Sequence, residues 1–298
     1  MSEKILEIKA LTFSYGEGNI LDGINLSVPK GAIYGYLGKN GAGKTTTINL
    51  ILKLLPNKPG SIFYNNEDIC TINESYFYHI GVLIQPLAMY NHLTCYEQLK
   101  YLNFFCDVSR ANIEQVLKDV DMFDHRNKKI KILSAGMKQR LSIAMALLHN
   151  PDLLILDEPI NGLDPNGINE FRALMKDLNK AGKTIFISSH ILGEMQKMCS
   201  HIGIIDRGKL LFQDSISKIV KSTTQIKIRT SDTSLSKDLL QQTGTQNIDI
   251  IDNDITCDIA GDAEYAKIIN TLCARNIDIY DISKKEVDLE SFYLNLIK

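Results

Sequence analysis

Residues 38–45 form the clearest chemical motif of the chain. They read Gly-Lys-Asn-Gly-Ala-Gly-Lys-Thr, which matches the phosphate-loop pattern G-x-x-x-x-G-K-[ST]. Glycines let the backbone turn its N–H groups toward an anion, the lysine neutralises phosphate charge, and the threonine hydroxyl suits Mg²⁺. A glycine-rich turn with an incidental lysine is the simpler alternative. The candidate nucleotide-binding residues are Gly38, Asn40, Gly41, Ala42, Gly43, Lys44, Thr45 and Thr46.

Two acidic residues follow an apolar run farther along the chain. Leu153–Leu156 is continuous and apolar, and Asp157, Glu158 and Pro159 come directly after it. Ligands of open α/β sheets bind where parallel strands end, so both carboxylates are placed to meet a nucleotide. Asp157 is the candidate Mg²⁺ ligand together with Thr45, and Glu158 is the candidate base that polarises an attacking water. A plain Asp-Glu-Pro turn is the alternative that the phosphate loop argues against.

The elements that must position these residues alternate between strand and helix, which predicts an α/β fold with helices packed on a sheet. The phosphate loop lies between a predicted strand at Ala32–Leu37 and a predicted helix at Thr45–Leu55, which Pro56 ends. Further strands are predicted at Leu153–Leu156, Thr184–Ser188 and Ile202–Ile205.

Two departures from this alternation suggest further parts. Residues 94–150 are rich in helical patterns, which predicts a helical subdomain inserted in the core. Near Ser222 the pattern changes to short alternating strands and two helices in the order βαββαβ, followed by a last helix. We therefore expect an ATPase-type domain at 1–221 and a small α+β domain at 222–298, with an order that suggests a ferredoxin-like unit.

The composition excludes several classes of protein. The 298 residues are 44% hydrophobic with a formal net charge of −2, so nothing predicts the basic face of a nucleic-acid-binding protein. The six cysteines form no CxxC pair, which favours reduced thiols over a zinc site or a disulfide scaffold. No window approaches the length of a membrane span, and the first residues lack the apolar core of a signal peptide. We expect a soluble chain.

A third motif narrows the class. Leu133-Ser-Ala-Gly-Met-Lys-Gln-Arg140 precedes an apolar helix, and Ser134 suits the cap of that helix, whose N-terminus can meet an anion. At this point the sequence resembles the ABC ATPase family, whose signature is usually Leu-Ser-Gly-Gly-Gln. The resemblance covers about Ile5–Phe212, with its motifs in the family's order. Ala135 and Met137 depart from the usual signature, whereas Gly136 remains.

The resemblance implies roles for further residues. Tyr15 matches the aromatic residue that stacks on adenine, and Gln85 matches the glutamine that touches Mg²⁺ beside the membrane partner. Asp164, in Asn-Gly-Leu-Asp, matches the loop that spans the dimer, and His190 matches the histidine that contacts the γ-phosphate. By resemblance, Gln85, Glu158 and His190 are the catalytic candidates.

The family mechanism implies two partners. Two copies would face each other head to tail, and each ATP on one phosphate loop would be closed over by Ser134 and Gly136 of the other copy. An integral membrane permease would hold the dimer at the inner face of the membrane, with the surface around Gln85 as the coupling face. The residues of these motifs look most like those of the bacitracin-resistance and lantibiotic-immunity branch. This resemblance implies export of an antimicrobial peptide or a similar amphipathic compound. Gln85 departs from that branch, where glutamate is frequent.

Two other functions compete with transport. A non-transport ABC ATPase that acts on nucleic acid or ribosomes is one, but DNA-repair members carry a long coiled coil where this chain has only residues 47–132, and translation-linked members carry two cassettes. A nucleotide sensor without turnover is the other, and the presence of Glu158 and His190 argues against it.

Overall fold

The chain divides into two compact units. The computed structural model describes residues 3–16, 18–84, 89–106, 108–222, 224–259, 261–286 and 289–296. The units are Met1–Gln213 and Asp214–Lys298, so the division falls after residue 213, whereas the sequence places it after residue 221. The side-chain amide oxygen of Gln213 accepts hydrogen bonds from the Ser27 amide and the Tyr34 hydroxyl, which ties this residue to the first unit.

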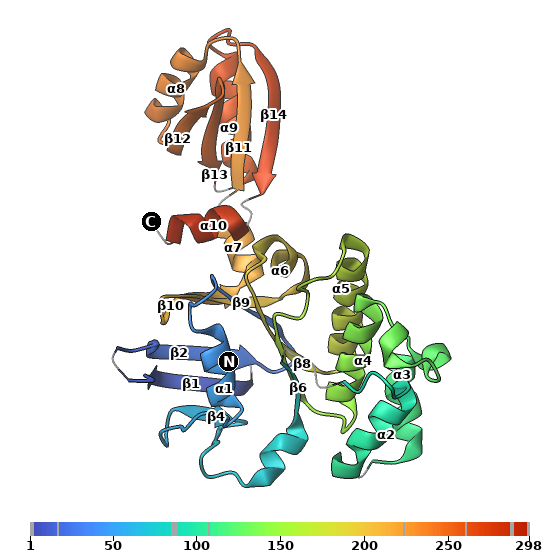
Figure 1. Cartoon of the computed structure of the whole chain (residues 1–298). Helices are drawn as coiled ribbons and strands as arrows, with labels where there is room; N and C mark the ends of the chain where they lie inside the picture. The colour runs from blue at the N-terminus through green and yellow to red at the C-terminus, as the bar shows by residue number, and fades with distance from the viewer. Residues whose placement is uncertain are drawn as a thin grey trace. The chain divides into compact units, whose positions relative to one another are not determined.

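A six-stranded sheet forms the centre of the first unit, in the order β10-β9-β3-β8-β7-β6 (Figure 1). The pairs β3–β8, β3–β9, β7–β8 and β6–β7 are parallel. Every residue of β3, β7 and β8 is buried, which explains why these strands read as continuous apolar runs rather than alternating ones. The strands are β3 (Ile33–Leu37), β6 (Ile80–Leu83), β7 (Leu153–Asp157), β8 (Thr184–Ser189), β9 (His201–Asp206) and β10 (Lys209–Ser215).

A second, antiparallel sheet was not predicted from the sequence. Its order is β2-β1-β4-β5, with β1 (Lys4–Phe13), β2 (Leu21–Pro29), β4 (Ile62–Tyr64) and β5 (Glu67–Asp68). The register of β1 against β2 shifts three times, and Ala10 adopts a positive φ of 44°. These irregularities break the strict alternation of buried and exposed residues by which a strand is recognised in a sequence.

Helices cover the parallel sheet and form the inserted subdomain. Figure 1 shows α2, α3 and α4 gathered together in the region 94–150, where the helical subdomain is expected. The helices of the unit are α1 (Lys44–Ile51), α2 (Cys95–Cys106), α3 (Arg110–Asp119), α4 (Ala135–Leu147), α5 (Pro165–Lys180) and α6 (Leu192–Met198), with 3₁₀ turns η1 (Glu74–His79), η2 (Phe123–His125) and η3 (Ile130–Ile132).

Helix α1 is shorter than the sequence predicts. The expected helix Thr45–Leu55 ends at Ile51, because Lys53 turns to a positive φ of 56°. Two side chains bind the last carbonyls of the helix. The Tyr76 hydroxyl donates to Ile51 O at 2.8 Å, and the Asn57 amide donates at 2.6 Å to Leu50 O, which also accepts from the Lys53 amide. Burial raises the pKa of Tyr76 well above its ordinary value, so the phenol keeps its proton.

The second unit is a four-stranded antiparallel sheet with helices on it. Its strands run in the order β12-β13-β11-β14, and the element order βαββαβ is that of a ferredoxin-like unit. Isoleucines of β11 and β13 pack with residues of α8 and α9 in one buried core. The elements are α7 (Ile216–Ser222), β11 (Thr224–Thr230), α8 (Thr233–Gln242), β12 (Gln246–Ile251), β13 (Asp254–Ile259), α9 (Asp262–Cys273), β14 (Ile279–Glu286) and α10 (Leu289–Leu296).

Replacing Tyr76 with phenylalanine tests the end of α1. The change leaves the buried Ile51 carbonyl without its donor, so we expect a loss of about 1–3 kcal/mol in the free energy of unfolding, measured by urea titration. Tyr78→Phe is the matched control, because Tyr78 lies on the same 3₁₀ turn but is 57% exposed. Equal stabilities of the two variants would contradict this account of the helix end.

Candidate functional site

The phosphate loop follows β3 and ends at α1, and two of its glycines are required by their surroundings. A Cβ at Gly38 would lie 2.4 Å from the carbonyl oxygen of Ile205. Gly43 caps α1 with a φ of 109°, and a Cβ there would meet Leu21 at 2.6 Å. Gly41 also has a positive φ, of 81°. The loop can therefore adopt this path only with glycine at these positions.

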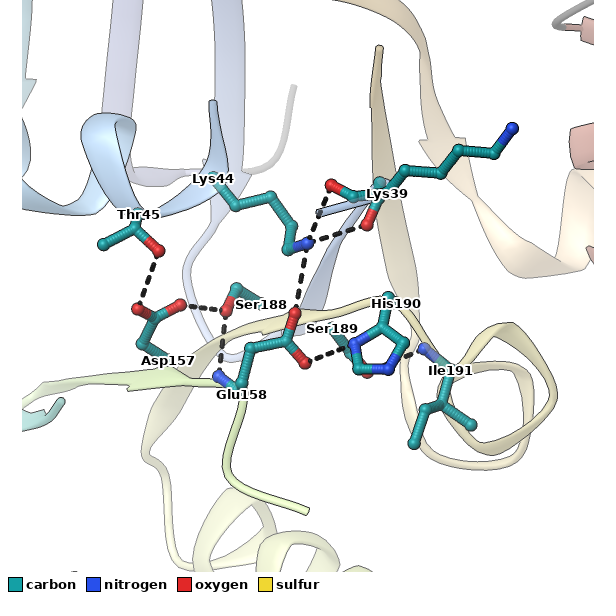
Figure 2. Close-up of polar contacts among 10 residues, drawn as sticks. Lys39, Lys44, Thr45, Asp157, Glu158, Ser188, Ser189, His190 and Ile191 are labelled. Atoms are coloured by element: carbon teal, nitrogen blue, oxygen red, sulfur yellow. Dashed lines mark hydrogen bonds and ion pairs between the residues drawn. The ribbon is translucent and has the colours of Figure 1, made fainter. Parts of the chain in front are cut away.

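Lys44 projects from the first turn of α1 into the site and is only 6% exposed. Its ammonium nitrogen Nζ donates to the carbonyl oxygens of Gly38 at 2.7 Å and Lys39 at 3.2 Å. The same nitrogen lies 3.1 Å from Oε1 of Glu158 (Figure 2). A buried ammonium is costly without partners, and these three oxygens compensate it.

Thr45, Asp157 and Ser188 form a second set of hydrogen bonds in the site (Figure 2). The Thr45 hydroxyl donates to Oδ2 of Asp157 at 3.0 Å, and the Ser188 hydroxyl donates to Oδ1 of the same carboxylate. Asp157 and Ser188 are register partners on β7 and β8, which places them side by side. The Ser188 oxygen also accepts from the Glu158 amide at 3.0 Å, so one serine orients both acids.

Glu158 joins Lys44 to His190. Its Oε2 lies 2.9 Å from Nδ1 of His190, which follows the end of β8. Glu158 has a positive φ of 48°, an uncommon conformation that turns the chain just after β7. We call Lys44, Thr45, Asp157, Glu158, Ser188 and His190 the loop cluster. It lies at the carboxyl edge of the parallel sheet, where ligands of α/β folds bind.

Ser134, Gly136 and Asp164 form a separate group, which we call the helix-end cluster. Ser134 caps α4 by accepting from the Met137 amide at 3.2 Å, and Asp164 caps α5 by accepting from the Gly167 amide at 2.8 Å. Gly136, Leu163 and Gly167 line one small cavity, and Arg140 of α4 pairs with Glu170 of α5 at 3.1 Å. The N-termini of the two helices are therefore neighbours.

The remaining predicted residues have mixed positions. Ala42 is buried and Thr46 half-buried, whereas Asn40 and Gly41 are exposed on the loop. Tyr15 is 64% exposed and forms a T-shaped pair with the Phe13 ring, with 4.9 Å between the ring centroids. Phe13 is the register partner of Leu21 on β2, and the Leu21 side chain packs against Gly43 of the loop. This end of β1 therefore lies close to the loop. Gln85 lies outside the described residues.

Sequence reasoning missed Ser188 and the direct pairing of Lys44 with Glu158. The polar run Ser188-Ser189-His190 after an apolar strand carried the signal for the serine, because β7 and β8 end at the same edge. The lysine–glutamate pair carried no signal, since nothing in the spacing of the two residues predicts a contact between them.

This fold and this cluster define the class of the protein. A strand, a glycine-rich loop and a helix that together present a buried lysine beside two acids are the parts of a phosphate-loop nucleotide hydrolase.

Among the described residues, no helix is both long and apolar enough to cross a membrane.

Comparisons with known proteins identify the family. A family model described as "ABC transporter" matches residues 21–161. The bacitracin transport ATP-binding protein BcrA of Enterococcus faecalis is 38% identical, over 99% of this chain and 97% of that protein. The lantibiotic transport ATP-binding protein SrtF of Streptococcus pyogenes is 38% identical, over 70% of this chain and 90% of that protein. The structure of CbiO1 from Clostridium perfringens superposes with a TM-score of 0.68 at 24% identity, covering 82% and 97% of the two chains, and shows the likeness of fold.

The chain belongs to the ABC transporter family. It is an ATP-binding subunit of an ABC transporter, an ATPase related to the bacitracin and lantibiotic transport ATP-binding proteins. The α/β class with the phosphate loop and the inserted helices, predicted from the sequence, is confirmed. A cassette that works on nucleic acid or ribosomes is not favoured by these relatives.

Replacing Lys44 with alanine tests the loop cluster. Lys44 supplies the buried positive charge of the loop, so we expect ATP affinity, measured by calorimetric titration, to fall at least about thirtyfold, the equivalent of roughly 2 kcal/mol. Lys39→Ala is the matched control, because Lys39 is exposed and its side chain points away from the cluster in Figure 2. Wild-type affinity in Lys44→Ala would contradict the assignment of the loop.

Proposed function

We propose that the loop cluster binds ATP as its magnesium complex. The observation that carries this proposal is the pair formed by the Thr45 hydroxyl and the Asp157 carboxylate, 3.0 Å apart beside the Lys44 ammonium. Hydroxyl and carboxylate oxygens are the hard ligands that Mg²⁺ prefers, so the donor set fits this ion, with Gln85 as a further oxygen ligand by resemblance. Bound Mg²⁺ would neutralise charge on the β- and γ-phosphates.

In this proposal the acids and the histidine divide the hydrolytic work. Glu158 acts as the general base that takes a proton from the attacking water, and Ser188 holds its backbone in place. His190 holds Oε2 of Glu158 and, by resemblance, contacts the γ-phosphate. Lys44 and the N–H groups of the loop stabilise the phosphate charge at the N-terminus of α1. Tyr15, exposed near the loop, stacks on the adenine.

The helix-end cluster is proposed to serve the ATP of a second copy. Ser134 and Gly136 lie at the exposed N-terminus of α4, where a partial positive charge and open N–H groups favour an anion. A Cβ added at Gly136 would meet nothing within 4 Å beyond the backbone of α4, so there is room beside this residue, and Ser134 is exposed. Asp164, at the neighbouring helix end, completes the part that spans the dimer.

A separate integral membrane permease is the proposed second partner, and it would hold this chain on the cytoplasmic face of the membrane. The surface around Gln85 is the proposed coupling face. Nucleotide chemistry is assigned to the first unit, because no proposed site residue lies beyond His190. The exported compound is proposed to be an antimicrobial peptide or a similar amphipathic molecule, and this rests on the relatives whose names specify bacitracin and lantibiotic transport.

Glu158→Gln provides the test of the dimer. The amide cannot accept the proton of the attacking water, so ATP should stay bound between two copies and yield a stable dimer in size-exclusion chromatography. Adding Ser134→Arg to the same chain should abolish the dimer while the loop cluster stays intact. A Glu158→Gln protein that binds Mg-ATP tightly and remains a monomer at high concentration would argue against the shared site.

Loss of the protein provides the test of the substrate. A host strain that lacks this chain should become more sensitive to bacitracin or lantibiotics, measured as the minimal inhibitory concentration. The wild-type chain should restore tolerance, and the Lys44→Ala chain should not, because transport requires ATP binding. Unchanged peptide tolerance together with altered handling of an unrelated solute would assign the chain to another export system.

A further inference from the structure

The Lys44 ammonium donates two hydrogen bonds to backbone carbonyls and forms an ion pair with one carboxylate. Its partners are the carbonyl oxygens of Gly38 and Lys39 and the carboxylate oxygen Oε1 of Glu158. An ammonium group has three donors and no more, so a phosphate oxygen that approaches Lys44 competes with these oxygens for it.

Glu158 is the partner that can leave. The two carbonyls belong to the backbone of the loop, and Gly38 is fixed against Ile205, where even a Cβ has no room. The carboxylate of Glu158 is carried by a side chain with rotatable bonds, and its Oε1 accepts no hydrogen bond from the described residues and is held by the ion pair with Lys44. A phosphate oxygen that takes the place of a Lys44 partner therefore takes the place of Glu158.

We propose that Glu158 is an internal counter-ion of Lys44, and that a nucleotide phosphate displaces it on binding. The proposal rests on the proposed role of the loop cluster as the phosphate site and deepens it. Lys44 and Glu158 are 6% and 18% exposed, so their attraction is screened by little water and opposes the entry of phosphate. The affinity of the loop for phosphate is therefore lower than it would be without this ion pair.

The exchange also controls the base. While Oε1 faces Lys44, this oxygen is held in an ion pair and is not free to accept a hydrogen bond from a water. When phosphate replaces it, His190 still holds Oε2, and Oε1 is left as an unpaired acceptor next to the bound phosphate. The general base is thus released where a phosphate has arrived.

ADP affinity measures the exchange apart from hydrolysis. Calorimetric titration with ADP without divalent metal, at low protein concentration, excludes turnover, metal binding and ATP-dependent pairing of chains. Glu158→Gln should bind ADP roughly tenfold more tightly than the wild type, because the neutral amide competes less well for Lys44. Glu7→Gln is the matched control and should leave the affinity unchanged, since Glu7 is 20% exposed and pairs with Lys4 and Lys9 away from the loop.

Glu158→Asp separates contact from charge and serves also if the glutamine variant does not fold. It keeps the negative charge but is shorter by one methylene, so it withdraws from Lys44 and should also raise ADP affinity. Unchanged or weaker ADP binding in Glu158→Gln would overturn the proposed exchange. Wild-type ADP affinity in Glu158→Asp would also overturn it, because the effect of the glutamine variant would then come only from the loss of charge at long range. A wild-type protein that binds no ADP would instead count against the proposed function of the loop cluster.

Discussion

A buried ammonium group must be surrounded by oxygen atoms, and in this chain that requirement falls on Lys44. The partners come from segments far apart in the sequence: the loop after β3 supplies two carbonyls, and the end of β7 supplies Glu158. They meet because parallel strands end at one edge of the sheet, which β3, β8 and β7 share as neighbours. The apolar core of these strands thus serves chiefly to hold a small group of charges in place.

The first unit carries two separate groups of polar residues. The loop cluster gathers the charged groups that act on phosphate, whereas the helix-end cluster offers two capped helix N-termini, of α4 and α5, tied together by Arg140 and Glu170. In the proposed pairing of two copies, a loop cluster and a helix-end cluster would meet at the same nucleotide, and the exposed Ser134 would face the second copy.

Much of the loop cluster could be predicted, because its motifs are short in sequence and their chemistry is specific. The phosphate loop, the buried run Leu153–Leu156 and the acids after it were recognised without the structure. Contacts between distant segments could not be recognised in this way. Ser188 contacts Asp157 because of the register of β7 against β8, and Glu158 contacts Lys44 only in the folded chain. The antiparallel sheet was missed because β1 is irregular. Helix α1 ends early because Lys53 turns to a positive φ, and Tyr76 and Asn57 then bind its last carbonyls.

Mixing two inactive variants tests the shared site most directly. Lys44→Ala keeps the helix-end cluster intact, and Ser134→Arg keeps the loop cluster intact, so each variant alone should lack a complete site. In an equal mixture, random pairing makes half of the dimers mixed, and each mixed dimer has one complete site out of two. The mixture should therefore recover roughly a quarter of the wild-type ATPase rate. A mixture as inactive as either variant alone would contradict the claim that each ATP is held by two copies of this chain.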